Sequence, residues 1–360
     1  MMPTQLSAAR AAFASLSPTS RSHSAATQVN LFPGTTQLRL RRAPFTARRQ
    51  SLIRAQATQI TSSDLKQLET LIEKNSEDDA VTLAASLRDS GILRAYGTGS
   101  QVPKRSYTLE ELRLNKIEPK NFLSPEDTTL NGIRNILQGS FLAGLSAGYF
   151  TNTLNVSELV QWGIIIAFLL TVDQIANAGG IEALIVDGAG RIISPTYGKR
   201  VALHESGHFL IAYLLGLLPK GYHLSSWDAF RAQRVLNVQA GTTFCDGAFQ
   251  KEVASGKLSS SSLDVYSCVA LAGVATEWLR FGRAEGGLAD VQQLDRLLRA
   301  LGFTQAKADD QVRWAVLNVV SILRRHEKVQ DRLADAMSRG ETVAECMAVI
   351  EKAMENNDNI

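Results

Sequence analysis

Cysteine and histidine are scarce in this chain of 360 residues, which contains three cysteines and five histidines. Cys245, Cys268 and Cys346 lie far apart and form no Cys-x-x-Cys pair. This spacing excludes a disulfide framework and a thiolate zinc site. We therefore expect three free, reduced thiols in the core.

Acidic residues are absent from the start of the chain, where Asp64 is the first. Residues 1–54 hold eight arginines, no lysine and thirteen serines or threonines, a composition typical of a disordered organelle transit peptide. Ile53-Arg54-Ala55 looks like a plastid-type processing site, which favours the chloroplast, in the stroma or at the thylakoid membrane, over the mitochondrion.

A basic arm that binds nucleic acid is the alternative for residues 1–54, but lysine runs and interleaved aromatic residues are missing there. Removing the eight arginines from the 38 basic residues leaves 30 against 35 acidic ones, a net charge of about −5. A mildly acidic protein has no global attraction for nucleic acid, so we expect no such partner.

A phosphate-binding loop of the form G-x-x-x-x-G-K-[ST] is also missing. Gly97, Gly99 and Lys104 come closest, but their spacing does not fit. This absence excludes a nucleotide-binding module of that type.

No apolar run reaches the ~20 residues that cross a bilayer. Residues 135–157 are uncharged, but Thr151-Asn152-Thr153 and Asn155 interrupt them, and only fourteen uncharged residues follow Glu158. We expect residues 126–180 to form an apolar helical hairpin, buried or at a membrane surface. Transmembrane insertion is the less favoured alternative.

One stretch contains residues that can bind a metal ion and transfer a proton. Residues 201–215 are mostly apolar, contain no proline, and hold His204-Glu205-Ser206-Gly207-His208. On a helix, residues four apart share one face, so His204 and His208 can bind one metal ion. Glu205 can then take a proton from a water on that metal, as a general base. The alternative is a core helix whose histidines are satisfied by hydrogen bonds.

The remaining pattern predicts a mainly α fold. Residues 55–125 read as a helical N-terminal region, with helix starts at Ser63, Asp78 and Thr108, and residues 306–360 as C-terminal helices.

Between them, residues 181–305 form the expected catalytic core. Residues 181–193 suggest a short strand or helix end, and residues 220–250 suggest a small β element that could align an extended peptide. A long helix is expected from Leu263 to Phe281, and Asp290 opens another.

A catalytic zinc site needs a third protein ligand. Three candidates stay open on spacing alone: Glu277 on the following helix, Asp290, and His223 on a loop.

Several segments resemble the FtsH-type zinc metallopeptidases. His204–His208 is similar to the HEAGH of that family, and residues 272–282 look like its GGRxAEExxFG helix. Residues 286–291 look like its TGAxNDL segment, and Leu301-Gly302-Phe303 like its WGF-type stretch. The order and spacing agree over residues 195–305. The match looks like the stand-alone plastid proteins of plants that lack the AAA ATPase module.

The resemblance implies roles for two acidic residues. The Asp of the NDL segment, here Asp290, would be the third zinc ligand, and Glu277 would orient a histidine from behind. Three departures from the family pattern, Ser206, Ala289 and Ala272-Gly273-Val274, concern substrate positioning more than the metal chemistry.

We therefore expect a Zn²⁺-dependent endopeptidase that hydrolyses plastid proteins or peptides without its own ATPase, served by a separate AAA ATPase or an FtsH complex. One alternative is a pseudo-peptidase that assists protease-complex assembly or thylakoid biogenesis. Another is an intramembrane zinc protease, although Asp187-Gly188 precedes the His-Glu-x-x-His motif instead of following it.

Overall fold

The computed structural model describes residues 63–118, 122, 125, 128–236 and 239–355. The chain divides into two compact units, residues 1–65 and 66–360, and the account below concerns the second. The predicted transit peptide, residues 1–54, lies outside the described residues.

The described residues are mainly helical, with one two-stranded sheet, as the sequence pattern predicts. Two of the three N-terminal helix starts are confirmed, because α3 spans Glu77–Asp89 and α4 spans Leu109–Leu114. Residues 63–73 are helical, but the residues before Ser63 lie outside the described part of the chain, so the start at Ser63 is not tested. Thr108 begins α4 with a capping box, because its side chain accepts from the Glu111 N–H while Glu111 accepts from the Thr108 N–H.

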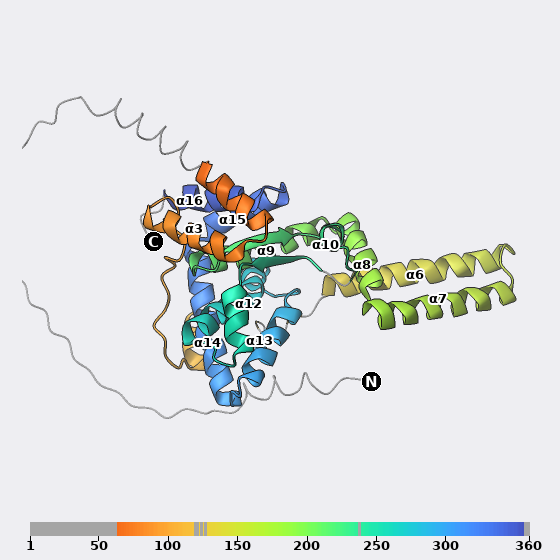
Figure 1. Ribbon diagram of the computed structural model, residues 1–360. Helices are drawn as coiled ribbons and strands as arrows, with labels where there is room; N and C mark the ends of the chain where they lie inside the picture. Colours follow the sequence, from red (N-terminus) through yellow and green to blue (C-terminus); the bar gives the residue numbers. More distant parts are fainter. Residues whose placement is uncertain (1–62, 119–121, 123–124, 126–127, 237–238, 356–360) are drawn as a thin grey trace, which may run out of the picture. The chain divides into compact units, whose positions relative to one another are not determined.

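The central helix is α9, Pro195–Leu214, which crosses the middle of Figure 1. Its residues from Ala202 to Leu214 are all buried. The helix begins at Pro195, because proline suits the first helical position. It ends before Gly216, whose φ of +83° lies in the left-handed region.

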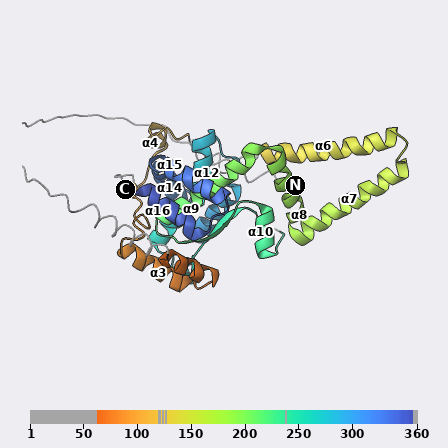
Figure 2. The same cartoon turned by 90° about the horizontal axis from the view of Figure 1, so that it is seen from above.

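Two helices, α12 (Ser260–Phe281) and α15 (Glu327–Ser338), lie directly against α9 (Figures 1 and 2). α14 (Gln305–Arg325) packs mainly on α12, and α16 (Val343–Met354) packs on α15. Ser259 caps α12, and Gly282 ends it with a φ of +75°. The expected free thiols are confirmed: all three cysteines are buried and unpaired with one another.

The small β element is confirmed in part. Strand β1 (Pro219–His223) pairs antiparallel with β2 (Gly241–Phe244), and Tyr222 lies opposite Thr242. Helix α10 (Ser226–Gln233) lies between the strands in the sequence, and α11 (Gly247–Ala254) follows. The strands therefore occupy only part of the segment from 220 to 250, and the two helices occupy much of the rest.

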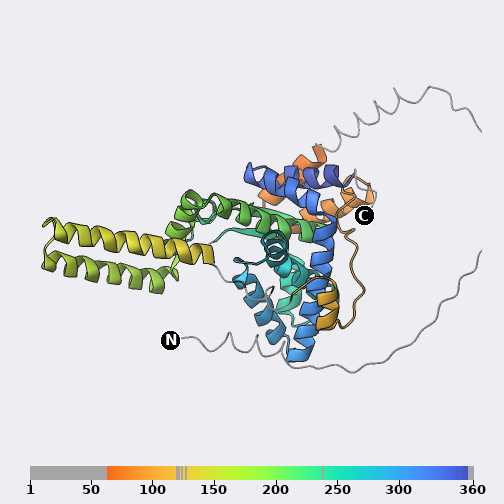
Figure 3. The same ribbon diagram turned by 180° about the vertical axis from the view of Figure 1, so that it is seen from behind.

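Residues 128–177 form the predicted hairpin, α6 (Thr128–Phe150) followed by α7 (Val156–Asn177), which run side by side in Figures 1 and 3. Of the two alternatives for the hairpin, the buried one is wrong, because only Ile133 on α6 and Asp173 on α7 are buried, and the membrane-surface one stays a prediction. The expectation that no segment is long enough to cross a bilayer is wrong. By length and composition α7 qualifies as a membrane span, because its 22 residues continue past both charges that bound the apolar run.

The expectation of a strand or helix end at residues 181–193 is also wrong, because α8 spans Gly180–Ile193. The Asp187-Gly188 pair resembles a turn, but the Asp187 carboxylate accepts from the Tyr197 hydroxyl at 2.8 Å and from the Ser226 N–H at 2.9 Å. These tertiary partners hold Asp187 inside a helix. α8 contacts α6, α7, α9 and α10.

Candidate metal centre

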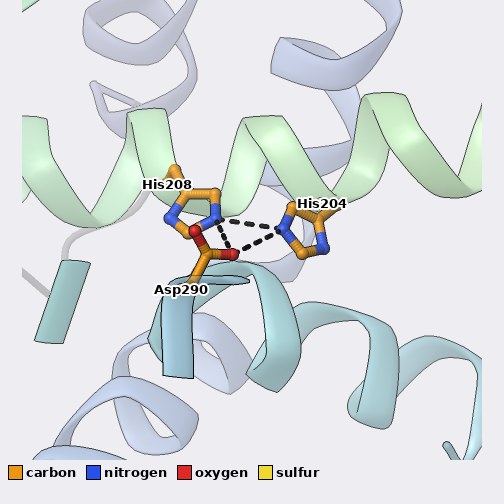
Figure 4. Close-up of side chains that lie close together, drawn as sticks. All are labelled: His204, His208 and Asp290. Atoms are coloured by element: carbon orange, nitrogen blue, oxygen red, sulfur yellow. Dashed lines mark hydrogen bonds and ion pairs between the residues drawn. The ribbon is translucent and has the colours of Figure 1, made fainter. Parts of the chain in front are cut away.

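His204, His208 and Asp290 converge on one point. Figure 4 shows both imidazoles projecting from α9 toward the carboxylate, which lies in the first turn of α13 (Leu288–Ala300). One ligand atom from each residue lies within 4.8 Å of the others. Both histidines are buried and Asp290 is half-buried. Within the described residues, neither His223 nor Glu277 belongs to this group.

The distances fit a tetrahedral zinc site. Two donors that each lie ~2.0–2.1 Å from a tetrahedral zinc ion are about 3.3–3.4 Å apart. The two Nε2 atoms of His204 and His208 lie 3.1 Å apart, and Oδ2 of Asp290 lies 3.4 and 3.5 Å from them. Two imidazole nitrogens and one carboxylate oxygen also match the donor set of catalytic zinc, which leaves a fourth position open.

The second nitrogen of each imidazole identifies the tautomer. Nδ1 of His208 lies 2.7 Å from the carbonyl oxygen of Val269, which can only accept. Nδ1 of His204 lies 2.7 Å from the Glu277 carboxylate. Both Nδ1 atoms therefore donate, so in neutral rings both Nε2 atoms carry lone pairs. Three electron-rich atoms then face one another at 3.1 to 3.5 Å, an arrangement that either a proton on one imidazole or a metal ion between the three atoms stabilises.

The pKa shifts of the metal-free protein also indicate that a positive charge is favoured between these donor atoms. Burial opposes a charge on His204, but hydrogen bonds to Asp290 and Glu277 outweigh it and raise its pKa well above the ordinary value. Burial likewise opposes ionisation of Asp290, but the neighbouring His208 charge and the His204 hydrogen bond hold its pKa far below the usual range. A proton on His204 thus supplies the positive charge that a metal would supply.

Glu277 lies behind the ring of His204, on the side away from Asp290. Burial penalises its charge, yet its contacts with His204, the Glu285 N–H and Arg200 lower its pKa to about 2. The Glu285 and Gly286 N–H groups donate to its carboxylate at 2.8 and 3.2 Å, and Arg200 donates at 3.1 Å. A carboxylate fixed this way holds the imidazole in one orientation.

Glu205 lines the same cavity as the two histidines, and this cavity encloses about 1570 Å³. The Thr242 hydroxyl on β2 donates to Oε2 of Glu205 at 2.9 Å. One carboxylate oxygen is thereby occupied, and Oε1 stays available for a proton. The strand that the sequence pattern predicts near the site is therefore in contact with the candidate base.

Sequence reasoning missed three contributors to the site. Gly273 is one, because an added Cβ would lie 2.2 Å from Nε2 of His204, so the ring packs directly on its backbone. Its presence in the middle of an otherwise apolar helix was the available signal. Arg200 and the Thr242 hydroxyl carried no local signal, because their partners lie 77 and 37 positions away.

Comparisons of the chain with protein-family models, with curated proteins and with solved structures found no match.

Proposed function

We propose that this protein is a zinc-dependent endopeptidase of the FtsH-like type, which acts on plastid proteins without an ATPase module of its own. The observation that carries the proposal is the convergence of three lone-pair donors at tetrahedral spacing, on the wall of a cavity that also contains Glu205. The His204–Glu205–His208 pattern and the resemblance of residues 195–305 support the reaction class. The arginine-rich leader supports the plastid location.

His204, His208 and Asp290 would hold the ion, and Glu277 would orient His204. When bound, zinc lowers the pKa of a coordinated water to about 7 and polarises a carbonyl oxygen. Glu205 accepts the proton of the attacking water on Oε1 and returns it to the leaving amine. The Thr242 hydroxyl fixes the orientation of the Glu205 carboxylate by donating a hydrogen bond to Oε2.

A metal analysis and a cleavage assay test the proposal. The purified protein should contain about one zinc per chain and cleave unfolded casein. Glu205→Gln should retain the zinc, because Glu205 is not a ligand, and lose cleavage by ~100-fold or more. Removal of zinc with a chelator should abolish activity, and zinc should restore it.

Equal cleavage by the wild type and Glu205→Gln would refute the mechanism. Bound zinc without cleavage in either protein would instead favour the pseudo-peptidase, provided that Glu205→Gln also rescues a null line. A protein that binds no metal at all would leave neither function supported.

A further inference from the structure

The α6–α7 hairpin exposes far more apolar surface than a soluble protein normally leaves in contact with water. Large side chains on α7 are about half exposed or more, including Val160, Trp162, Ile164, Phe168, Leu169 and Leu170. A core helix has the same composition, but only 6% of the most apolar window of α7 is buried. A signal sequence is excluded by position, because α7 begins at Val156.

The exposed residues surround α7 and do not form one stripe. At 100° per residue, Ile164, Phe168, Ile165 and Leu169 lie within an arc of about 140°, Leu170 lies about 100° beyond that arc, and Val160 lies in the remaining part of the circumference. A helix that docks on a protein partner presents one apolar face and keeps the other polar, whereas a helix that is apolar all round suits lipid.

Charges occur only at the two ends of the hairpin, and each has a partner. Glu158 closes a capping box with Asn155 at the tip. At the base, Asp173 accepts from the N–H groups of Ile181 and Glu182, and Arg134 pairs with Glu182 at 2.6 Å. Residues 135–157 and 159–172 carry no charge. Helices also satisfy their own backbone groups, which hydrocarbon demands.

The dimensions agree with a bilayer. α6 has 23 residues and α7 has 22, which correspond to about 35 and 33 Å, against ~30 Å of hydrocarbon. Glu158 and Asp173 lie about 22 Å apart along α7 at 1.5 Å per residue, so both reach the headgroups if the bilayer thins locally.

We propose that the α6–α7 hairpin is inserted in a lipid bilayer, with its base on the side that carries the metal centre. α8 follows at that base and exposes Ile181, Ile185 and Ile192, which share one helical face at spacings of four and seven. Such a face suits the bilayer interface. The cavity at the metal centre is lined by Leu130, Arg134, Ala183 and Asp187 as well as by His204, so insertion holds the cavity close to the membrane surface.

Vesicle insertion tests the proposal. The full chain is synthesised in a cell-free system with vesicles of phosphatidylcholine, which carry no net charge, and the vesicles are floated after an alkaline carbonate wash. Wild-type protein should float and resist the wash. Ile164→Glu/Phe168→Glu places two carboxylates in the hydrocarbon and should reduce the floated fraction by ~100-fold or more.

The matched control is Val81→Glu/Leu114→Glu, which adds the same charges at exposed apolar residues of α3 and α4 and should float like the wild type. Circular dichroism shows whether each variant folds, and mutation of exposed residues leaves the core intact. Release of wild-type protein by the wash, or equal flotation of the hairpin variant, would overturn the proposal. A soluble wild type whose dimer dissociates on Ile164→Glu/Phe168→Glu would overturn it too and identify a surface between copies.

Discussion

His204 is the most constrained side chain of the candidate site. Its ring packs on the backbone of Gly273, donates from Nδ1 to Glu277, and directs Nε2 toward His208 and Asp290. An imidazole held on all sides loses little entropy when it binds a metal, so the position of the third ligand decides the affinity.

Replacement of Asp290 by asparagine tests that ligand. Asp290→Asn keeps the size of the side chain but removes the negative charge, so zinc affinity should fall by ~100-fold or more. The matched control is Asp295→Asn on the same helix, an exposed residue paired with Arg299, which should bind zinc like the wild type. Competition with a chromophoric chelator measures both affinities. Unchanged affinity in Asp290→Asn would remove this residue from the metal centre.

Protons and zinc should compete for the same site. Because the folded pKa of His204 is raised, its proton stabilises the metal-free fold fully below pH ~6.5, and this contribution is lost as the pH rises through the higher folded value. Zinc must displace that proton, so binding at pH 7 should release about one proton per site. Titration calorimetry in two buffers of different ionisation heat measures the release, and identical heats in both buffers would contradict the assignment.

The contact between α9 and α12 depends on small residues. Gly207 faces Thr276, and an added Cβ would lie 2.3 Å from its hydroxyl and 3.0 Å from the Ala272 carbonyl. Gly207→Ala should therefore lower the free energy of unfolding by ~1–3 kcal/mol, through overpacking. Gly188→Ala is the control, because nothing lies within 4 Å of its Cβ position on α8, and it should change stability by less than ~1 kcal/mol. Urea unfolding measures both.

The presence of a helix could be predicted where the residue that caps it lies next to it in the sequence. Thr108, Ser259 and Thr342 each cap a helix by accepting from the N–H three residues on, a pattern visible in the sequence. The extent of α7 was not predictable, because Glu158 and Asp173 look like ends of an apolar run. Their charges are satisfied by Asn155 and by N–H groups of the next helix, so α7 continues past both.

The candidate site could also be predicted only in part, because some of its contacts are local in the sequence and others depend on tertiary packing. Helical spacing alone puts His204 and His208 on one face, since the two residues are four apart. Asp290 follows His204 by 86 positions, and its convergence depends on how α13 packs. The spacing in the sequence could not decide which of Glu277, Asp290 and His223 is the third ligand, and only the family resemblance favoured Asp290.

At the scale of the whole molecule, one buried ion network connects the base of the hairpin to the metal centre. Thr128 and Thr129 in the first turn of α6 donate to Glu285 at 2.9 and 2.5 Å. Arg200 lies 3.5 Å from Glu285 and 3.1 Å from Glu277, which in turn holds His204. Two buried carboxylates thus share one guanidinium, and the start of α6 is coupled to the orientation of a candidate metal ligand.

Arg200→Gln should therefore destabilise the metal-free protein by ~1.5–3 kcal/mol at pH 7, because it removes the shared cation and leaves Glu277 with His204 and Glu285 with Arg283 as cationic partners. The pKa values of Glu277 and Glu285 are both lowered, so their ionised forms contribute stability that is present above pH ~4.5 and lost as the pH falls through the folded pKa values, which for Glu277 is about 2. The deficit of Arg200→Gln should consequently shrink between pH 7 and pH 3, and Arg200→Lys, which keeps the charge, should show a smaller deficit at pH 7. Urea unfolding at both pH values measures these differences. An equal deficit at both would show that Arg200 acts mainly by packing, through its guanidinium 4.1 Å above the ring of Phe281.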